Sequence, residues 1–299
     1  MRLLVTGGAG FIGSHLVKYL VHRGHSVLAL DNFRTGNPGN LAEVKDSIDF
    51  HKVNILESDK LKPLAKDIDG VFHEAALTDV QESFSKPQEY HNINVVGTDN
   101  IFKLAKEYGF KVVYASSSSV YGNPKGIPIQ ENAQREPLNP YGKSKLDGEF
   151  LAEKYSKNGV RITGLRYFNV YGEGQSGSYA GVITKFLEKI RRHQSPIIYG
   201  DGLQIRDFVY VEDVARANLL AMEKNLDSSF INIGSGKPTS ILDLAHMVIG
   251  ASGLDMKPVH EKALKGDVRQ SQANISLAQK LLEWNPQVEL KDWLRKVLK

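Results

Sequence analysis

The sequence contains no cysteine among its 299 residues. Disulfides, thiolate nucleophiles and cysteine-ligated metal sites are therefore excluded, and we expect no bound metal. Long apolar runs are absent too, since no stretch approaches the roughly 18 uninterrupted apolar residues of a membrane helix. Because the N-terminus leads directly into a segment that suits a strand, we expect no signal peptide, no membrane contact and a cytoplasmic location.

Neither sign of charge dominates the sequence. Its 38 lysines and arginines and 34 aspartates and glutamates leave a net charge of +4, and the basic residues are spread along the chain. A nucleic-acid-binding protein would gather them in a patch or stripe. We therefore expect no nucleic-acid partner, and at most a local basic pocket for a phosphorylated ligand.

The first 31 residues predict a strand, a glycine-rich turn, a helix and a second strand. Apolar residues dominate 2–6, and they recur at helical spacing in 14–23. Between these segments, Gly7, Gly10 and Gly13 form a G-x-x-G-x-x-G pattern. Missing side chains there let backbone N–H groups approach a pyrophosphate, whose charge the helix N-terminus favours. This order of elements predicts a dinucleotide-binding site.

Asp31 follows the second predicted strand, at residues 26–30, where a carboxylate can accept both ribose hydroxyls of an adenosine. Its negative charge would repel a 2′-phosphate, so the sequence predicts NAD rather than NADP. Arg34 lies close enough to weaken this preference, but a solvated surface arginine is the simpler interpretation.

Strand-like and helical segments alternate along the first half of the chain. This alternation predicts an α/β fold with a doubly wound parallel sheet (Rossmann) and a second, smaller α/β substrate-binding domain. We expect the NAD-binding domain at 1–168, with a return to it at about 208–234, and the second domain at 169–299. The cleft between the domains is the expected site. The six strands predicted for the first domain are 2–6, 26–30, 48–53, 70–73, 111–115 and 161–166.

Tyr141 and Lys145 are four residues apart on a predicted helix, hence on one face. The usual tyrosine pKa of about 10 is too high for a base at neutral pH. A neighbouring ammonium and a positive nicotinamide ring both favour phenolate, so we expect the pKa of Tyr141 to be lowered. Ser117, at the end of a predicted strand, can then share the proton of a substrate hydroxyl. His73 also ends a strand, and we predict a structural role for it.

Six segments together resemble the UDP-galactose (UDP-glucose) 4-epimerase family of extended short-chain dehydrogenases. They keep the family's order and spacing, and the resemblance covers nearly the whole chain. The segments are Gly7-Gly8-Ala9-Gly10-Phe11-Ile12-Gly13-Ser14, Asp31-Asn32, Ser116 to Gly122, Pro140 to Lys145, Tyr167-Phe168-Asn169 and Arg206-Asp207-Phe208.

The resemblance implies a tightly held NAD and inversion of C4 of a UDP-hexose through a transient 4-keto sugar. Tyr141 would take the proton of the 4-hydroxyl while hydride leaves C4, Lys145 would hold the nicotinamide ribose, and Ser117 would bind the reacting oxygen. It also implies a homodimer formed through the predicted helices at 87–108 and 140–157. Apolar residues on more than one face of the first helix agree with this.

The family's binding residues are carried over position by position. For the substrate, the resemblance implies that Asn169 contacts the diphosphate, Tyr199 lies against the uracil and Arg206 pairs with phosphate, with further contacts from Ser117, Arg269 and Ser271. For NAD, it implies contacts from Gly7, Gly10, Phe11, Ile12, Gly13, Asp31, Asn32, Asn54, Ile55, Ala75, Ala76, Asn94, Tyr141 and Lys145.

Two positions depart from the family pattern, and a third affects which sugars the site can accept. Asn54 replaces an aspartate that accepts from the adenine amine, which an amide oxygen can still do. Leu264 replaces a phosphate-binding arginine, whose charge Arg269, Lys262 or Lys265 can supply. Ser271 is small where a tyrosine would fill the space of an N-acetyl group, so the N-acetylated sugars are expected as well.

Three other functions compete with this interpretation. A UDP-uronic acid 4-epimerase is the nearest, because Ser116 to Gly122 also looks like that group, whereas Tyr167-Phe168-Asn169 looks more like the neutral-sugar group. A sugar-nucleotide lyase (4,6-dehydratase or decarboxylase) needs a carboxyl group where this chain has Ser118 and Ser119. A catalytically silent NAD-binding protein would not need Ser117, Tyr141 and Lys145 together.

Overall fold

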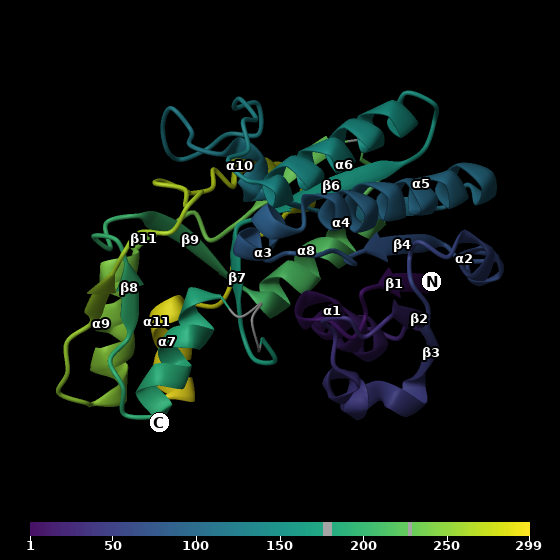
Figure 1. The fold of residues 1–299 in the computed structure, drawn as a ribbon. Helices are drawn as coiled ribbons and strands as arrows, with labels where there is room; N and C mark the ends of the chain where they lie inside the picture. The colour runs from purple at the N-terminus through teal and green to yellow at the C-terminus, as the bar shows by residue number, and fades with distance from the viewer. Residues whose placement is uncertain (176–180, 227–228) are drawn as a thin grey trace.

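A seven-stranded sheet forms the centre of the molecule in the computed structural model, which describes residues 1–175, 181–226 and 229–299 (Figure 1). The strand order is β10-β6-β5-β4-β1-β2-β3, and every neighbouring pair is parallel. This confirms the predicted doubly wound sheet. The strands are β1 (Arg2–Thr6), β2 (Ser26–Asp31), β3 (Ile48–Lys52), β4 (Gly70–His73), β5 (Lys111–Ser117), β6 (Ile162–Tyr167) and β10 (Ser229–Ile233).

Two helical layers cover the faces of this sheet (Figure 1). Alternate residues of β1 pack into different layers, because Leu3 and Val5 join one apolar cluster and Leu4 joins the other. A strand buried on both faces reads as a continuous apolar run, as β1 does. One layer contains α1 (Phe11–His22), η1 (Pro38–Ser47), α8 (Val211–Glu223) and α10 (Ser276–Leu282). The other contains α2 (Ser58–Leu64), α5 (Gly97–Tyr108) and α6 (Pro140–Ser156).

The helix predicted at 87–108 is one helical segment with a change of pitch inside it. It consists of α4 (Pro87–His91), the π-helical turn η2 (Asn92–Val96) and α5. Such π-helical turns inside α-helices are frequent at functional sites. Two shorter helical elements, α3 (Val80–Ser85) and η3 (Ser118–Tyr121), precede α4 and α6 along the chain.

The second lobe has its own small sheets and apolar core. One sheet has the order β11-β9-β7 and the other pairs β12 with β8. Aromatic side chains fill this core, with Tyr171 and Trp293 ring centres 5.0 Å apart. The elements are β7 (Asn169–Tyr171), α7 (Val182–Arg191), β8 (Ile197–Tyr199), β9 (Ile205–Tyr210), β11 (Pro238–Ser240), α9 (Ile241–Ser252), β12 (Val259–Glu261) and α11 (Leu290–Val297).

The predicted return to the first lobe at about 208–234 needs a correction at its start. Helix α8 packs against α1, and β10 pairs with β6, as expected for a return. Strand β9, however, pairs with β7 and β11 in the small sheet. Its Phe208 and Tyr210 side chains pack in the core of the second lobe, and this burial keeps the strand there.

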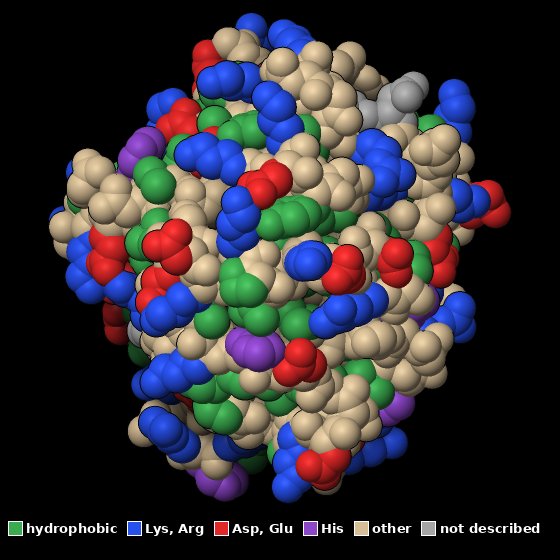
Figure 2. All heavy atoms as spheres, turned by 90° about the vertical axis from the view of Figure 1, so that its right-hand side faces the viewer, with side chains coloured by type: hydrophobic (Ala, Val, Ile, Leu, Met, Phe, Trp, Pro, Cys, Tyr) green, Lys and Arg blue, Asp and Glu red, His purple; other side chains and the backbone are tan. Residues whose placement is uncertain are grey.

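The surface shown in Figure 2 carries charged side chains of both signs, with lysines and arginines interspersed among aspartates and glutamates. Within the part of the chain that the structure describes, no helix is long and apolar enough to cross a membrane.

Candidate functional site

A cavity of about 370 Å³ lies at the carboxyl ends of the parallel strands and is lined by both lobes. Ligands of doubly wound sheets bind at this edge, where the direction of the strand order reverses. Here that point lies between β1 and β4. The cavity brings together most of the site residues predicted from the sequence: Gly7, Gly10, Phe11, Ile12, Gly13, Asp31, Asn32, Asn54, Ile55, Ala75, Ala76, Ser117, Tyr141, Lys145 and Asn169.

The glycine turn has the shape that a pyrophosphate requires. Gly7 adopts a left-handed φ of 67°, and the Gly10 N–H donates to the Gly7 carbonyl over 2.9 Å. A Cβ on Gly13 would lie 2.1 Å from that carbonyl oxygen, so only glycine fits there. Helix α1 begins at Phe11 without a side-chain cap at Gly10. Its first N–H groups therefore face the cavity and suit an anion, which fits the diphosphate of NAD.

Asp31 lines the cavity at the end of β2, and both of its oxygens accept backbone hydrogen bonds. Oδ2 accepts from the Ala9 N–H over 3.0 Å and Oδ1 from the Phe33 N–H over 2.7 Å. Burial raises the pKa of this carboxyl, and these hydrogen bonds oppose the rise. The neighbouring Arg34, also at the cavity wall, forms an ion pair with Glu89 of α4. Its charge is therefore balanced by a carboxylate, which supports NAD over NADP.

We predict that Asp31→Asn lowers the ratio of NAD affinity to NADP affinity by at least about tenfold, or about 1.4 kcal/mol. The amide removes the charge that repels a 2′-phosphate and keeps one of the two oxygens that accept from the Ala9 and Phe33 N–H groups. Calorimetric titration with each cofactor measures the ratio. Asp49→Asn, at an exposed carboxylate of β3, is the matched control and should not change it. An unchanged ratio in Asp31→Asn would remove this carboxylate from the ribose site.

Ser117, Tyr141 and Lys145 meet at one wall of the cavity, although β5 and α6 supply them from distant parts of the chain. Asn139 caps α6 by accepting from the Gly142 N–H over 2.8 Å, and Pro140 occupies the first turn, so this helix begins directly before Tyr141. The Lys145 Nζ donates to the Ala115 carbonyl over 2.8 Å and lies 5.4 Å from the centre of the Tyr114 ring.

The pKa of Tyr141 differs from the sequence prediction. Burial raises it, and a hydrogen bond with the Ser117 side chain lowers it by less. In the protein without cofactor, burial disfavours the phenolate more than Ser117 favours it, and the lowering that a bound nicotinamide would cause stays a prediction. Burial also lowers the pKa of Lys145 to about 8.

Glu74 and Tyr167 are cavity residues to which the sequence analysis gave no role in the site. Glu74, directly after β4, lines the cavity, and its Oε1 accepts from the Tyr167 hydroxyl over 2.8 Å. Burial raises the pKa of Glu74 to about 7. The sequence could have indicated Glu74, because it stands between a buried strand and two alanines. Residues at the strand ends of this edge of a sheet lie at the site.

Asn94 was predicted as a cofactor contact, but the structure places its side chain behind the cavity wall. The side chain is 1% exposed. Its amide accepts from the Leu77 N–H over 2.8 Å and donates over 2.9 Å each to the Leu77 carbonyl and the Ser144 hydroxyl. The π-helical turn thus fixes the loop after β4 against α6, so Asn94 acts on the site through its neighbours.

His73 has the structural environment that the sequence predicted. Its Nδ1 lies 2.8 Å from the Thr6 hydroxyl and its Nε2 lies 2.9 Å from the Thr98 hydroxyl. Burial lowers its pKa to about 3, so the ring is neutral at ordinary pH. Both ring nitrogens are occupied, and neither is directed at a reacting group.

The predicted substrate residues other than Ser117 and Asn169 lie outside this cavity. Tyr199 lines a second cavity of about 330 Å³ beside α7, together with Leu264. Arg206 forms an ion pair with Asp267 and donates to the Ile205 carbonyl over 2.7 Å. Ser271 is buried, and its N–H donates to that same carbonyl over 3.1 Å.

Two of the three residues considered as replacements for the arginine missing at Leu264, Arg269 and Lys265, have other partners. Arg269 forms two hydrogen bonds of 2.8 and 2.9 Å with Asp201. The Lys265 Nζ lies 4.9 Å from the centre of the Phe84 ring. Arg206 is likewise paired with a carboxylate, that of Asp267 in the Gly266-Asp267 turn.

A doubly wound sheet, a glycine turn at its edge and a serine–tyrosine–lysine set in the same cavity define a nicotinamide-dependent enzyme of the extended short-chain dehydrogenase type. The chain belongs to the NAD dependent epimerase/dehydratase family, whose model matches residues 3–234. It is a UDP-sugar 4-epimerase, an NAD-dependent isomerase.

Individual relatives resemble the chain over nearly its full length. The UDP-glucose 4-epimerase of Mycolicibacterium smegmatis is 36% identical, covering 100% of this chain and 97% of its own. The structure of the Thermotoga maritima UDP-glucose 4-epimerase with UDP-glucose matches with a TM-score of 0.95 at 36% identity, covering 100% and 97%.

Two further similar structures are those of 4-epimerases named for other sugars. The UDP-N-acetylglucosamine 4-epimerase of Methanobrevibacter ruminantium M1, in complex with UDP-N-acetylmuramic acid, matches with a TM-score of 0.94 at 34% identity, covering 99% and 96%. The UDP-glucuronic acid 4-epimerase of Bacillus cereus, with NAD, matches with a TM-score of 0.93 at 35% identity, covering 99% and 97%.

Proposed function

We propose that this enzyme interconverts UDP-glucose and UDP-galactose and also accepts the N-acetylated pair. The observation that carries the reaction is that Ser117, Tyr141 and Lys145 share one cavity with the glycine turn. The observation that carries the choice of sugar is the small side chain of Ser271, beside Arg206 and β9.

The roles of the three residues follow from their chemistry. Tyr141 takes the proton of the sugar's 4-hydroxyl, and Ser117, on the same wall of the cavity, binds the same oxygen. Lys145 holds the nicotinamide ribose, and its charge favours the phenolate form of Tyr141. A bound nicotinamide supplies the acceptor for the hydride of C4 and afterwards its donor. The keto sugar turns between the two transfers, so that hydride returns to its other face.

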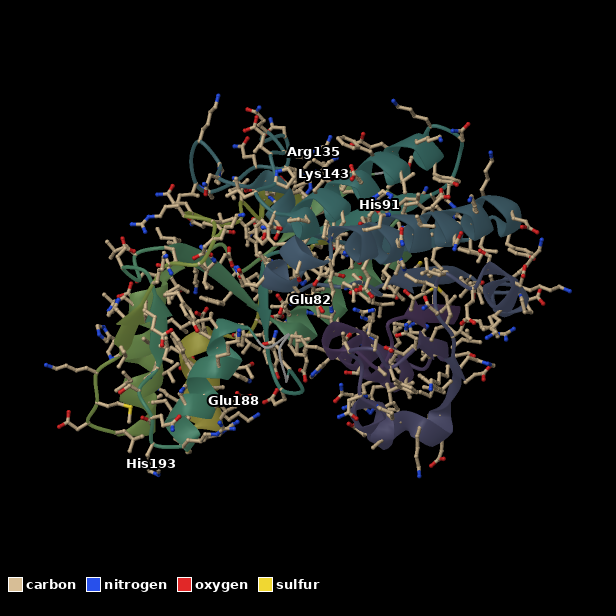
Figure 3. The ribbon with its side chains drawn as sticks, in the orientation of Figure 1. Glu82, His91, Arg135, Lys143, Glu188 and His193 are labelled. Carbon is tan, nitrogen blue, oxygen red and sulfur yellow. The ribbon has the colours of Figure 1, made fainter. Side chains whose placement is uncertain are left out.

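The nucleotide half of the substrate fits the second cavity. We infer that the uracil lies against Tyr199, between α7 and the segment that contains Leu264. Figure 3 shows Glu188, which lines this cavity, on α7, and His193 just beyond the end of that helix at the lower edge of the second lobe. Asn169 and Arg206 come from neighbouring strands of one sheet, β7 and β9, between the two cavities, which suits a diphosphate.

A uronic-acid sugar is the second candidate, because the Bacillus cereus structure matches so closely. Its carboxylate would require a cation near the sugar. Among the described residues that line the main cavity, the basic side chains are Arg34, which pairs with Glu89, and Lys145. This supports a neutral sugar. The lyase alternative would need an acid where Ser118 and Ser119 stand.

Incubation of the purified protein with a panel of UDP-sugars, without added cofactor, tests the proposed function. We expect products from UDP-glucose and from UDP-N-acetylglucosamine, and none from UDP-glucuronate. Turnover of UDP-glucuronate alone would favour the second candidate.

We predict that Ser271→Tyr lowers turnover of the N-acetylated pair by about ten- to a hundredfold and spares UDP-glucose, because overpacking typically costs about 1–3 kcal/mol. Parallel kcat/KM measurements on the two sugar pairs check this. Ser58→Tyr, at the exposed start of α2, controls for an added tyrosine. Equal loss of both activities would contradict the placement of Ser271 beside the 2-substituent.

The cytoplasm stays the expected location of the protein. We also propose a homodimer formed through the layer of α5 and α6. Val96 of η2 and Phe150 of α6 are 42% and 47% exposed, and both would be covered in such a dimer. Figure 3 shows Lys143, His91 and Arg135 on the same side of the molecule, around the helices that would pair. Light scattering should give about twice the 33.2 kDa of one chain.

A further inference from the structure

Glu149 is a buried carboxylate on α6 that the proposed chemistry does not use, and its side chain is fully buried. It follows Lys145 by one helical turn and Tyr141 by two, so these three side chains lie along one side of the helix. A carboxylate at such a depth needs hydrogen-bond partners, since an unpaired buried charge is costly.

Each oxygen of the Glu149 carboxylate accepts from two donors within the described part of the chain. Oε1 accepts from the Ser116 hydroxyl over 2.6 Å and from the Arg166 Nε over 2.8 Å. Oε2 accepts from the Arg166 Nη2 over 2.8 Å and from the Arg135 Nη1 over 2.9 Å. Because a carboxylate offers about four acceptor sites, these bonds use its full capacity.

Arg166 of β6 holds this carboxylate in one orientation. The two parallel bonds from its guanidinium to Glu149 fix the plane of the carboxylate as well as its position. The guanidinium is itself held, because Nη1 donates over 2.8 Å each to the Tyr121 hydroxyl and the Glu131 carbonyl. It also lies 5.0 Å from the centre of the Tyr121 ring and 5.1 Å from that of Phe230.

Ser116 connects this carboxylate to the end of β5. It directly precedes Ser117, and both residues line the cavity. A serine hydroxyl has one proton to donate, and Ser116 gives it to Glu149. That proton is therefore not available to a bound ligand, and the bond instead ties the last turn of the strand to α6.

Two further contacts hold α6 against the same end of β5. The Lys145 Nζ donates to the Ala115 carbonyl over 2.8 Å. A Cβ on Gly148 would lie 2.2 Å from the Tyr114 hydroxyl, so the helix approaches the strand as closely as a glycine allows. The two residues that precede Ser117 are thus both bonded to α6.

We propose that Glu149 is a positioning residue that acts through Ser116. The bond between them fixes Ser117 relative to Tyr141, so that both side chains reach one sugar oxygen; this consequence rests on the proposed function. Ser117 belongs to β5 and Tyr141 to α6, so their relative position depends on how the strand and the helix are joined. A misplacement of about 1 Å at a reacting group can cost about 100-fold in rate.

Ser116→Ala is the decisive test, because it removes the bond to Glu149 and leaves both arginine contacts of the carboxylate in place. We expect kcat to fall by at least about tenfold. KM and the Kd of NAD should stay within about twofold, because positioning acts on the reacting oxygen and not on ground-state binding. Steady-state rates with UDP-glucose and calorimetric titration with NAD measure these quantities, and circular dichroism checks the fold.

A double-mutant cycle with Ser117→Ala shows whether the effect passes through Ser117. If Ser116 acts by placing Ser117, Ser116→Ala should cost less than about twofold in kcat when Ser117 is already alanine. A merely structural role would give the same loss in both backgrounds.

Glu149→Gln and Glu153→Gln form a matched pair on α6. Glutamine at 149 keeps the shape but loses the charge and one acceptor, so we expect a fall in kcat at least as large as that of Ser116→Ala in protein shown to be folded. Glu153 follows one turn later, is 40% exposed and accepts from the same Arg135 over 2.9 Å. Its substitution should leave kcat unchanged.

A measurement without sugar separates this inference from the proposed function. The rates are compared with whichever UDP-sugar in the panel turns over. If none does, NMR of ζ-¹³C-labelled tyrosine decides: the Tyr141 resonance, assigned by its loss in Tyr141→Phe, should move in Ser116→Ala and stay in Glu153→Gln. An unchanged kcat in folded Ser116→Ala, equal losses in both backgrounds of the cycle, or an unmoved Tyr141 resonance would overturn the proposal.

Discussion

Tyr141→Phe is expected to lower turnover by about 10²–10⁴-fold while NAD stays bound, because the substitution removes only the oxygen that moves the proton. The ring packs in a small apolar cluster with Leu77 and Tyr90, and phenylalanine keeps that packing. Steady-state rates with UDP-glucose and calorimetric titration with NAD measure the two quantities separately.

Tyr155→Phe is the matched control for this experiment. Tyr155 lies on the same helix, and its hydroxyl donates to Asp99 over 2.8 Å at the outside of the layer. Its loss should leave turnover unchanged. If Tyr141→Phe retained more than half of the activity, the proton would have to be taken by another group.

Gly13→Ala is expected to lower the affinity for NAD by at least about a hundredfold and turnover in proportion. The added Cβ would meet the Gly7 carbonyl oxygen at 2.1 Å. The Cβ is fixed to the backbone of α1 and the carbonyl belongs to the backbone of the turn, so neither can rotate away. The turn must open, and the N–H groups of α1 then lose their position around the pyrophosphate.

Gly250→Ala provides the control, since this glycine is in α9 and a Cβ there meets nothing within 4 Å. It should bind NAD normally, and replacing a helical glycine by alanine typically stabilises by about 1 kcal/mol. NAD affinity is measured by calorimetry on cofactor-depleted protein, and circular dichroism checks the fold. Normal NAD binding by Gly13→Ala would contradict the diphosphate site assigned to this turn.

The site predictions that need no knowledge of the fold depend on residues close together in the sequence. The glycine spacing determines the turn, because only residues without a Cβ fit its contacts. The spacing of Tyr141 and Lys145 places both on one helical face whatever surrounds the helix. The alternation of strand-like and helical segments predicted the parallel sheet, because the apolar periodicity of each segment can also be read from neighbouring residues alone.

The parts that failed depend on burial and on distant contacts. The direction of the Tyr141 pKa follows from how deeply α6 is covered, which spacing does not reveal. Asn94 was assigned to the cofactor, but a π-helical turn directs its amide to Leu77 and Ser144. Strand β9 was expected to return to the first lobe, but the packing of its aromatic side chains keeps it in the second.

The sequence by itself thus predicted the dinucleotide turn, the carboxylate that would favour NAD and the tyrosine–lysine pair. Only the tertiary structure decided which residues face that pair. Glu74 and Tyr167 are 93 residues apart, and Tyr167 and Asn218 are 51 apart, yet they form one hydrogen-bonded network beside Lys145. Local rules fix periodicity and turns, whereas the charges that act on a buried group are set by how distant segments pack around it.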